Sequence, residues 1–355
     1  MEKVRVAVVG CGAIANVMHL PGIATMRQMG LVDIVAVADA IPEKSKATAA
    51  AFDVPHYYSD YTHMLGSHDI DLVVNLTPIP DHFSVNLAAL KTGRNVYTQK
   101  PMATSVEDAS LLIDEAKRQG VKLASAPEHP VRPMIQTMRN LIREGAIGKV
   151  SFARVQSSHE GPEKHKVARD STWFYKPGSS PILDLGVHGL SQITAILGPV
   201  QRLSCFSGRS IPVRYHENND FAGKAIDVEI DDNSLLMLDF GDARFGFLDS
   251  TYCVTASLGP RLEIFGTEGT LAVVGRGGTD TTLRLFQASS REWRDVEVPA
   301  SPPVRDLGVL HLVDSLRDGS DLVLTGERGR HLVEVMAKAP LAASEGRTLD
   351  MATTF

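Results

Sequence analysis

The stretch VRVAVVGCGAIANVMHL, residues 4–20, decides the fold class. Its apolar first part predicts a buried strand, and a glycine-rich turn joins that strand to a helical pattern. Short apolar runs of the same kind recur up to residue 126 and are separated by amphipathic stretches. Such alternation is typical of a parallel sheet covered by helices on both faces. We therefore expect residues 1–126 to form a doubly wound α/β domain of the Rossmann type.

The turn itself has the spacing of a dinucleotide-binding loop. Gly10 permits a tight turn, Gly12 leaves room for a pyrophosphate against the backbone, and Ala15 lets the helix pack close to the sheet. The start of the helix offers unpaired N–H groups and the positive end of the helix dipole to an anion. The predicted cofactor-binding residues of this loop are Gly10, Gly12, Ala13, Ile14 and Ala15.

Asp39 ends the second apolar run and is predicted to select the cofactor. A carboxylate at this position accepts hydrogen bonds from the ribose hydroxyls of an adenosine and repels a 2′-phosphate, which favours NAD over NADP. The alternative is a helix-capping role, because Pro42 and Glu43 resemble the first turn of a helix.

Capping residues and apolar runs predict a helix and six strands in the first domain. Thr104 and Glu107 fit a capping box and predict a helix with Leu111, Leu112 and Ala116 on one face. The expected strands are Val4–Val9, Val32–Asp39, Leu72–Leu76, Asn95–Thr98 and Lys122–Ala126, with a weaker edge strand at Val54–Tyr58.

After about residue 149 the pattern changes to strands joined by Gly, Asp and Asn turns, as in RFGFLDSTYC and RLEIFGTEGTLAVVG. We expect residues 127–355 to form an α+β domain with a large, mainly antiparallel open sheet, which binds substrate and supports oligomerisation. A final amphipathic helix is expected near Arg330–Glu345. The domain boundary is expected near Ala126–Pro133, where prolines cluster.

Composition excludes several classes of protein. The 355 residues carry a formal net charge of −6, which argues against a general nucleic-acid binder. Three cysteines far apart in sequence predict neither a disulfide framework nor a zinc site, so no metal is expected and a reducing cytoplasm is the simplest compartment. The chain begins on a strand pattern and has no long apolar run, so we expect no signal peptide and no membrane span.

The stretch DLGVH contains a second candidate site. Asp184 and His188 are four residues apart, so a helix would place both on one face. A histidine suits the removal of a hydroxyl proton near neutral pH. A buried, mutually satisfied Asp–His pair is an equally valid interpretation of the spacing alone. Upstream, Trp173 and Phe174 could form an apolar platform for a pyranose face or pack in a core.

Three motifs in this order resemble the Gfo/Idh/MocA oxidoreductase family, named after glucose–fructose oxidoreductase and inositol dehydrogenase. They are the glycine loop, QKP at 99–101 and DLGVH at 184–188. The segment NLTPIPDH at 75–82 is similar to the family's T-P-x-x-x-H segment beside the nicotinamide. Alone, QKP could be a surface loop with a solvated lysine. The resemblance spans nearly the whole chain.

The resemblance implies roles for specific residues. Lys100 would be a catalytic group that stabilises a developing alkoxide, with Pro101, in a cis peptide, fixing its direction. His188 would be the general acid/base, and Asp184 would bind a substrate hydroxyl. Further implied cofactor contacts are Thr77, Pro78, His82, Gln99 and Lys100.

Departures from the family pattern concern the substrate. Gln99 stands where the family usually has glutamate, so a charge next to Lys100 is missing. Glu128 and His129, in PEHPVRP, become candidate substrate contacts. The expected substrate-binding residues are Lys100, Glu128, His129, Trp173, Phe174, Asp184 and His188.

These features favour an NAD-dependent dehydrogenase that oxidises a ring secondary hydroxyl of a sugar, a glycoside (with C3 as one candidate carbon) or a cyclic polyol. One alternative is a glycoside-cleaving enzyme that works through transient oxidation and elimination, with Glu128 or His129 as the extra acid/base. Another is a non-catalytic dinucleotide-binding subunit. A homo-oligomer, a dimer or a tetramer, is expected because an open sheet has a face to cover.

Overall fold

The computed structural model describes residues 2–165, 170–217, 220–275 and 281–355. The chain divides into two compact units. The first contains Met1–Arg132, Ala300–Val333 and Phe355, and the second contains Pro133–Pro299 and Glu334–Thr354. The sequence predicts one boundary after residue 126, whereas in the structure the first division follows Arg132 and the chain returns to the first unit at Ala300.

The first unit is built on a six-stranded sheet in the order β3-β2-β1-β4-β5-β6, and all its strand pairs are parallel. This is the doubly wound arrangement that the sequence predicts, with the weak strand at the edge. The strands are β1 (Val4–Val9), β2 (Val32–Ala38), β3 (His56–Tyr58), β4 (Leu72–Asn75), β5 (Asn95–Thr98) and β6 (Leu123–Ser125).

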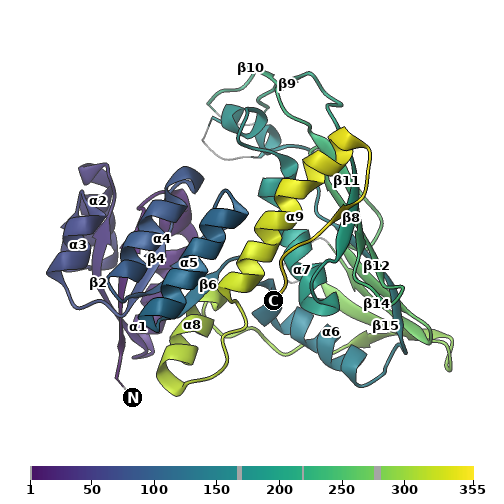
Figure 1. The fold of residues 1–355 in the computed structure, drawn as a ribbon, viewed down its shortest axis with the longest axis horizontal. Helices are drawn as coiled ribbons and strands as arrows, with labels where there is room; N and C mark the ends of the chain where they lie inside the picture. Colours follow the sequence, from purple (N-terminus) through teal and green to yellow (C-terminus); the bar gives the residue numbers. More distant parts are fainter. Residues whose placement is uncertain (1, 166–169, 218–219, 276–280) are drawn as a thin grey trace. The chain divides into compact units, whose positions relative to one another are not determined.

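Helices lie beside the sheet of this unit, as Figure 1 shows for α1 to α5 and α8. They are η1 (Ala15–His19), α1 (Leu20–Gln28), α2 (Pro42–Phe52), α3 (Tyr61–Ser67), η2 (Ile79–Asp81), α4 (His82–Lys91), α5 (Val106–Gln119), η3 (His129–Val131) and α8 (Leu307–Asp318). The predicted capping box is wrong by one residue, because the N-cap of α5 is Ser105, which accepts from the Asp108 N–H. Of the three residues predicted to share one face, Leu112 and Ala116 are buried, whereas Leu111 is 54% exposed.

The strand order reverses at β1, and this reversal positions the candidate site. Val9 at the end of β1 pairs with Ala38 of β2 on one side and with Asn75 of β4 on the other. The loops after β1 and β4 therefore leave the sheet at the same edge and in adjacent positions. In open α/β sheets, ligands bind at such a switch point beyond the carboxyl ends of the strands.

The returning segment 300–333 completes the core of the first unit. Helix α8 contacts β1, β5 and β6, and Val309, Leu312 and Val313 are fully buried in the cluster that covers the sheet. Beyond α8, the backbone of Ser125 donates to the carbonyl of Leu324 and extends the hydrogen bonding at the β6 edge. The sequence pattern had not indicated α8 as part of this unit.

The second unit contains a nine-stranded sheet, antiparallel except where β7 pairs with β12, which confirms the predicted α+β class. From edge to edge its strands are β16 (Glu292–Val296), β15 (Thr282–Gln287), β14 (Gly269–Val274), β13 (Leu262–Gly266), β7 (Val150–Gln156), β12 (Phe245–Thr251), β11 (Asn233–Asp239), β8 (Arg202–Gly208) and β17 (Leu349–Asp350). A small sheet pairs β9 (Val213–Tyr215) with β10 (Ala225–Asp227).

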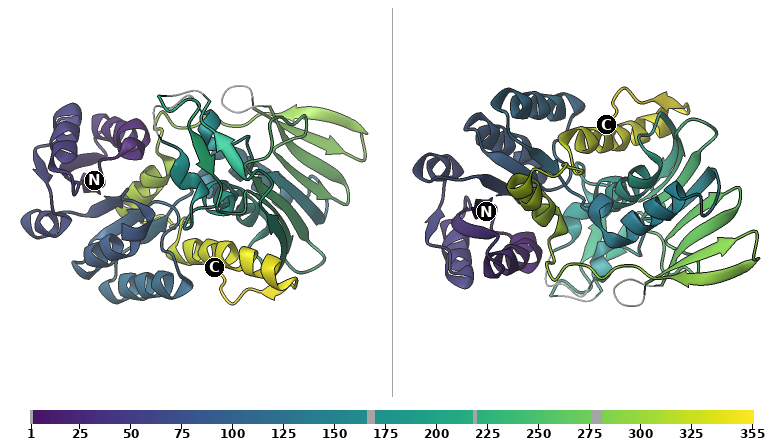
Figure 2. Two further views of the ribbon diagram at one scale, coloured as in Figure 1. Left: turned by 90° about the horizontal axis from the view of Figure 1, so that it is seen from above. Right: turned by 90° about the horizontal axis from the view of Figure 1, so that it is seen from below.

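Helices cover one face of the large sheet, as Figures 1 and 2 show. They include α6 (Pro133–Arg143), η6 (Ile182–Gly186) and α7 (Val187–Leu197), while η4 (Pro162–Lys164) and η5 (Thr172–Tyr175) lie in the preceding connection. The long helix α9 (Gly326–Glu345) confirms the predicted final helix and begins in the first unit.

The other face of the large sheet carries many exposed aromatic and aliphatic side chains among charged ones. On β11, Leu236 and Leu238 are buried, whereas Leu235 and Met237 point the other way and are exposed. Strand register places directly paired residues on the same face. This face, called the open face below, carries Phe152, Phe206, Leu235, Met237, Phe245, Phe247, Phe265, Phe286 and Trp293.

Candidate functional site

The glycine loop has the shape that a pyrophosphate requires. Gly10 has φ +95°, and a Cβ there would lie 2.6 Å from the backbone of Leu76, so only glycine fits. At Gly12 a Cβ would meet nothing within 4 Å, which leaves open space beside the loop backbone. Ala15 is fully buried, while Ile14 is exposed. These residues fit a bound dinucleotide.

Asp39 is held by the same loop. Its carboxylate accepts hydrogen bonds from the backbone N–H of Cys11, at 2.8 Å, and of Ile41, at 2.9 Å. The side chain remains partly exposed at the carboxyl end of β2. The carboxylate is therefore fixed beside the loop, and it does not act as a capping side chain for α2, whose N-cap is Ile41.

Thr77 and Pro78 follow β4 beside Gly10. Asn75 accepts from both the N–H and the hydroxyl of Thr77, which fixes this turn. His82 lies beneath it with ring nitrogens 2.9 Å from the carbonyl of Thr77 and 2.6 Å from that of Pro101. Burial lowers the pKa of His82, although both carbonyls oppose the shift. His82 is 1% exposed, so it supports the loops rather than presenting its ring to a ligand.

Lys100 follows β5 at the same edge of the sheet, and its peptide bond to Pro101 is cis, as the sequence analysis expects. The backbone N–H of Lys100 donates to the side-chain oxygen of Gln99 at 3.1 Å. The side-chain nitrogen of Gln99 lies 2.6 Å from Nε2 of His19. Gln99 thus joins the lysine turn to the helix that follows the glycine loop.

Glu128 and His129 are largely buried in the first unit. The guanidinium of Arg132 donates to the Glu128 carboxylate at 2.5 Å. Burial, followed by the charge of Arg132, lowers the pKa of His129 to about 3. A buried, ion-paired carboxylate is poorly suited to proton transfer, so the setting of Glu128 does not favour it as an additional acid/base.

In the second unit Asp184 lies in the π-helical turn η6, and His188 lies in the first turn of α7. Both are partly exposed, while their neighbours Gly186 and Val187 are buried. The missing side chain of Gly186 lets the helix pack closely on the sheet rather than making room for a ligand, since a Cβ there would lie 2.8 Å from the Ser250 hydroxyl. The close packing fixes the helix, and the two candidate side chains on it remain partly exposed.

Tyr252 and His159 were missed by sequence reasoning. Tyr252 is fully buried and donates its hydroxyl to Asp184 at 3.1 Å. Burial, followed by the charge of Asp184, raises the pKa of Tyr252, so the phenol stays a donor. The His159 ring stacks on Tyr252 at 5.4 Å, and burial lowers its pKa to about 4. An aromatic residue at the end of a strand ordinarily indicates core packing, so the sequence carries no specific signal for this contact.

Trp173 and Phe174 take different positions. Phe174 is 3% exposed in a cluster that also contains Tyr252, whereas Trp173 is 52% exposed and stacks on Phe174 at 3.8 Å between centroids. Phe174 is therefore a core residue that supports Trp173. An exposed indole on a rigid base can serve as a platform for the apolar face of a sugar.

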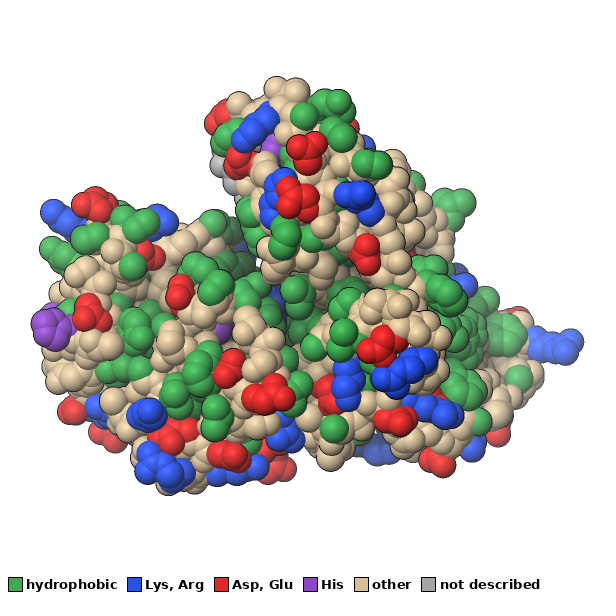
Figure 3. Space-filling model, turned by 45° about the horizontal axis from the view of Figure 1, so that its top comes forward, with side chains coloured by type: hydrophobic (Ala, Val, Ile, Leu, Met, Phe, Trp, Pro, Cys, Tyr) green, Lys and Arg blue, Asp and Glu red, His purple; other side chains and the backbone are tan. Residues whose placement is uncertain are grey.

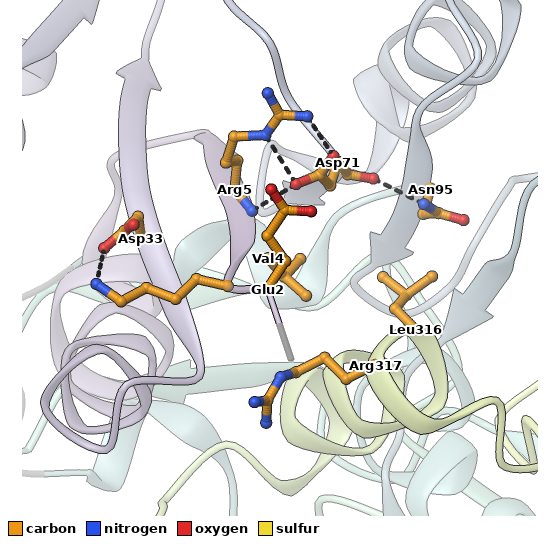
Figure 4. A pocket seen from close by; sticks show the side chains of 9 residues that line it. Glu2, Val4, Arg5, Asp33, Asp71, Asn95, Leu316 and Arg317 are labelled. Carbon is orange, nitrogen blue, oxygen red and sulfur yellow. Dashed lines mark hydrogen bonds and ion pairs between the residues drawn. The ribbon is translucent and has the colours of Figure 1, made fainter.

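A cavity of about 650 Å³ lies at the opposite edge of the first sheet (Figure 4). It is lined by residues at the amino ends of the strands, where Arg5 pairs with Asp71 and Lys3 pairs with Asp33. Ligands of open α/β sheets bind at the carboxyl edge, so we do not assign the cofactor to this cavity.

The described residues contain no group of three side chains suited to holding a metal ion, and none of their helices is long and apolar enough to cross a membrane. On the face shown in Figure 3, acidic and basic side chains are interspersed.

Comparisons with known proteins identify a family for this chain. A family model described as "Oxidoreductase family, NAD-binding Rossmann fold" matches residues 4–126, and one described as "GFO/IDH/MocA C-terminal domain" matches residues 135–272. D-apiose dehydrogenase of Paraburkholderia graminis is 26% identical over 99% of this chain and 90% of its own length. The NADP-linked scyllo-inositol 2-dehydrogenase of Bacillus subtilis is 22% identical over 98% of this chain and 96% of its own.

Solved structures share the fold. An NAD-binding oxidoreductase of Klebsiella pneumoniae superimposes with a TM-score of 0.85 at 19% identity and covers 99% of both chains. A levoglucosan dehydrogenase in complex with NADH superimposes with a TM-score of 0.83 at 17% identity, covering 99% of this chain and 100% of that one.

Proposed function

The chain belongs to the Gfo/Idh/MocA family of oxidoreductases, and from this premise we propose that it is an NAD-dependent dehydrogenase of a sugar, a glycoside or a cyclic polyol. The substrate group is a secondary hydroxyl on a ring. The observation that carries the proposal is the pair of partly exposed side chains Asp184 and His188 on one fixed helical segment, in a chain with an intact dinucleotide loop. Full-length relatives act on apiose and scyllo-inositol, as their names state.

We propose NAD as the preferred cofactor because of Asp39. Its carboxylate is held by two backbone N–H groups and cannot easily swing away from a 2′-phosphate. The scyllo-inositol relative uses NADP, so family membership does not decide this preference. The charge of Asp39 is the argument for NAD.

Each catalytic residue has a proposed role. NAD supplies the acceptor for the hydride that leaves the substrate carbon. His188 removes the hydroxyl proton as general base, and Asp184 accepts a hydrogen bond from a neighbouring hydroxyl while Tyr252 holds that carboxylate in place. Lys100 stabilises the negative charge that develops on the substrate oxygen. Trp173 is proposed to stack on a sugar ring.

The test is purified protein with NAD and a panel of aldoses, glycosides and inositols, monitored by NADH absorbance. We expect net NADH formation with at least one member of the panel. His188→Asn and Lys100→Met should abolish turnover while NAD still binds in a fluorescence titration. Product formation without net NADH would instead indicate glycoside cleavage through transient oxidation. Near-normal turnover by either variant would refute the assigned roles.

We also propose that the open face joins two copies of this chain. It is rich in aromatic residues, and Phe206 is 81% exposed on it, whereas monomers rarely expose large contiguous apolar patches. The cross-strand ion pair of Arg154 with Glu263 lies on the same face. Met237→Lys should lower the mass measured by light scattering, whereas Leu258→Lys, in an exposed loop, should leave it unchanged. Equal masses for both variants would contradict the proposal.

A further inference from the structure

A chain of three hydrogen-bonded side chains, two of them buried, connects the helix after the glycine loop to the turn that carries Lys100. It consists of Asp306, His19 and Gln99 and is called the His19 chain below. Oδ2 of Asp306 lies 2.6 Å from Nδ1 of His19, and Nε2 of His19 lies 2.6 Å from Nε2 of Gln99. His19 and Asp306 are 0% and 1% exposed. Two polar groups so deeply buried are costly unless each is hydrogen-bonded, and Gln99, which is half-buried, completes the contacts of His19.

Local sequence explains how these groups meet. His19 lies at the end of the π-helical turn η1, immediately before Leu20-Pro21, and Pro21 has no N–H to continue the α-helical ladder. Asp306 is the N-cap of α8, where its Oδ1 accepts from the Val309 N–H at 3.0 Å. Gly22 allows the approach, because a Cβ there would lie 2.7 Å from Cβ of Asp306. Both carboxylate oxygens are therefore used.

The hydrogen bonds fix where every proton in the chain must be. The backbone N–H of Lys100 is always a donor, so the atom of Gln99 that faces it, at 3.1 Å, must be the oxygen. The amide nitrogen of Gln99 then faces His19 and donates, so Nε2 of His19 must accept. The remaining proton of the neutral ring lies on Nδ1 and is donated to Asp306. One tautomer alone satisfies all three partners.

We propose that His19 and Asp306 are positioning residues for Lys100, and that Gln99 is the link that transmits their orientation to the lysine turn. The proposal rests on the proposed function, because it takes Lys100 as a catalytic residue. The amide at position 99 is essential to the proton pattern. A carboxylate there would have no proton to give, and the chain would then need an additional proton on His19.

Other groups that face the chain do not alter the proton pattern. The ring of Tyr97, on β5, lies 6.0 Å from the His19 ring, and its hydroxyl has no hydrogen-bond partner among the described residues. Burial, followed by the charges of Asp306 and Glu128, raises the pKa of Tyr97, so it remains a neutral phenol. Arg132 opposes this shift and is itself paired with Glu128. Of the charged groups named in this paragraph, Asp306 is the one that contacts His19 directly.

A double-mutant cycle tests the chain. Asp306→Asn keeps the cap, because asparagine caps helices as well as aspartate does, but it turns an amide nitrogen toward His19. The ring proton must then move to Nε2, where it opposes the donor of Gln99. Gln99→Glu removes that opposition, because its carboxylate accepts from both Nε2–H and the Lys100 N–H. Together the two substitutions rebuild a complete chain with the proton pattern reversed and the formal charge unchanged.

We expect D306N alone to lower kcat/KM by about 10- to 100-fold, through buried donors left unpaired. Q99E alone should lose activity as pH rises, because its chain works only with a doubly protonated His19. The double variant should return to within about 3-fold of the wild type and lose the added pH dependence, as a restored hydrogen-bond set requires. If the losses of kcat/KM in D306N and Q99E simply multiply in the double variant, the proposal is overturned.

The histidine tautomer gives a readout that needs no substrate. Nitrogen-15 NMR of histidine-labelled protein, with His19 identified by H19N, should show a proton on Nδ1 in the wild type and on Nε2 in the double variant. A proton on Nε2 of His19 in the wild type would refute the proposed proton pattern and with it the proposal. If the wild type turns over no substrate, the proposed function fails, and the chain is still judged by the tautomers and by a matching cycle in melting temperature.

Discussion

Replacing Gly10 or Gly12 by alanine should separate the folding role of the glycine loop from its binding role. Gly10 combines a positive φ of +95° with a Cβ position 2.6 Å from the backbone of Leu76. The backbone conformation costs about 1–2 kcal/mol in an alanine, and overpacking against atoms that cannot rotate away costs about 1–3 kcal/mol. G10A should therefore lose about 2–5 kcal/mol of the free energy of unfolding.

G12A is the matched control, because a methyl group there meets nothing within 4 Å in the protein. Its stability should stay within about 0.5 kcal/mol of the wild type. Its affinity for NAD should nevertheless fall at least about 10-fold, because the methyl group would occupy the space proposed for the pyrophosphate. Differential scanning fluorimetry without cofactor and calorimetric titration with NAD measure the two quantities separately.

The expected pattern is a melting temperature lowered by roughly 4–20 °C in G10A, an unchanged one in G12A, and weak NAD binding in G12A. Normal NAD affinity in G12A would refute the placement of the pyrophosphate. Wild-type stability in G10A would refute the close approach of the turn to the loop after β4. The two outcomes are independent, so each part of the reasoning can fail alone.

Three further predictions concern charge and hydrogen bonding. Asp39→Ser should raise the ratio of NADP to NAD turnover by about 10-fold or more, in steady-state assays with both cofactors, since it removes the charge that repels a 2′-phosphate. Tyr252→Phe should lower kcat/KM about 10-fold while NAD affinity is unchanged, because it deletes the hydrogen bond to the charged Asp184; equal loss of NAD affinity would contradict this. The pKa of Glu334 is lowered to about 2. Burial would raise it, but hydrogen bonds from the backbone of 352–353 and from Lys338 to the carboxylate outweigh burial. The ionised Glu334 therefore stabilises the fold fully above its unfolded pKa of about 4.3, and this stabilisation is lost as pH falls toward 2. The amide resonances of residues 352–353 should shift in that pH range in the wild type and stay constant in Glu334→Gln.

The first sheet could be predicted from the sequence because its strands are apolar on both faces. Continuous runs such as Val4–Val9 carry the signal locally, and their bounds match the structure closely. Capping of α5 was less certain, since Thr104 with Glu107 and Ser105 with Asp108 both have the spacing of a cap. Only packing of the helix against the sheet selects between two registers one residue apart.

The candidate site was predictable only where a motif lies within a short segment. The loop at Gly10 and the spacing of Asp184 and His188 are local, and the sequence displays them. Tyr252 reaches Asp184 from a strand far along the chain, and Asp306 reaches His19 across 287 residues. Each of these partners appears in the sequence as an ordinary core or cap residue, because its role is set by a tertiary contact.

The dinucleotide-binding unit is discontinuous in sequence, and the energetics of α8 show why. Val309, Leu312 and Val313 have no exposed surface and pack in the same cluster as the strands of the first sheet. Full burial of each such side chain contributes about 1.5–3 kcal/mol, so these three alone match much of the about 5–15 kcal/mol that stabilises a whole domain. A fragment that ends at residue 126 would expose the surface that they cover and would leave His19 buried without Asp306. Residues 300–333 are therefore part of the first unit's fold, and they also set the proton pattern at its candidate site.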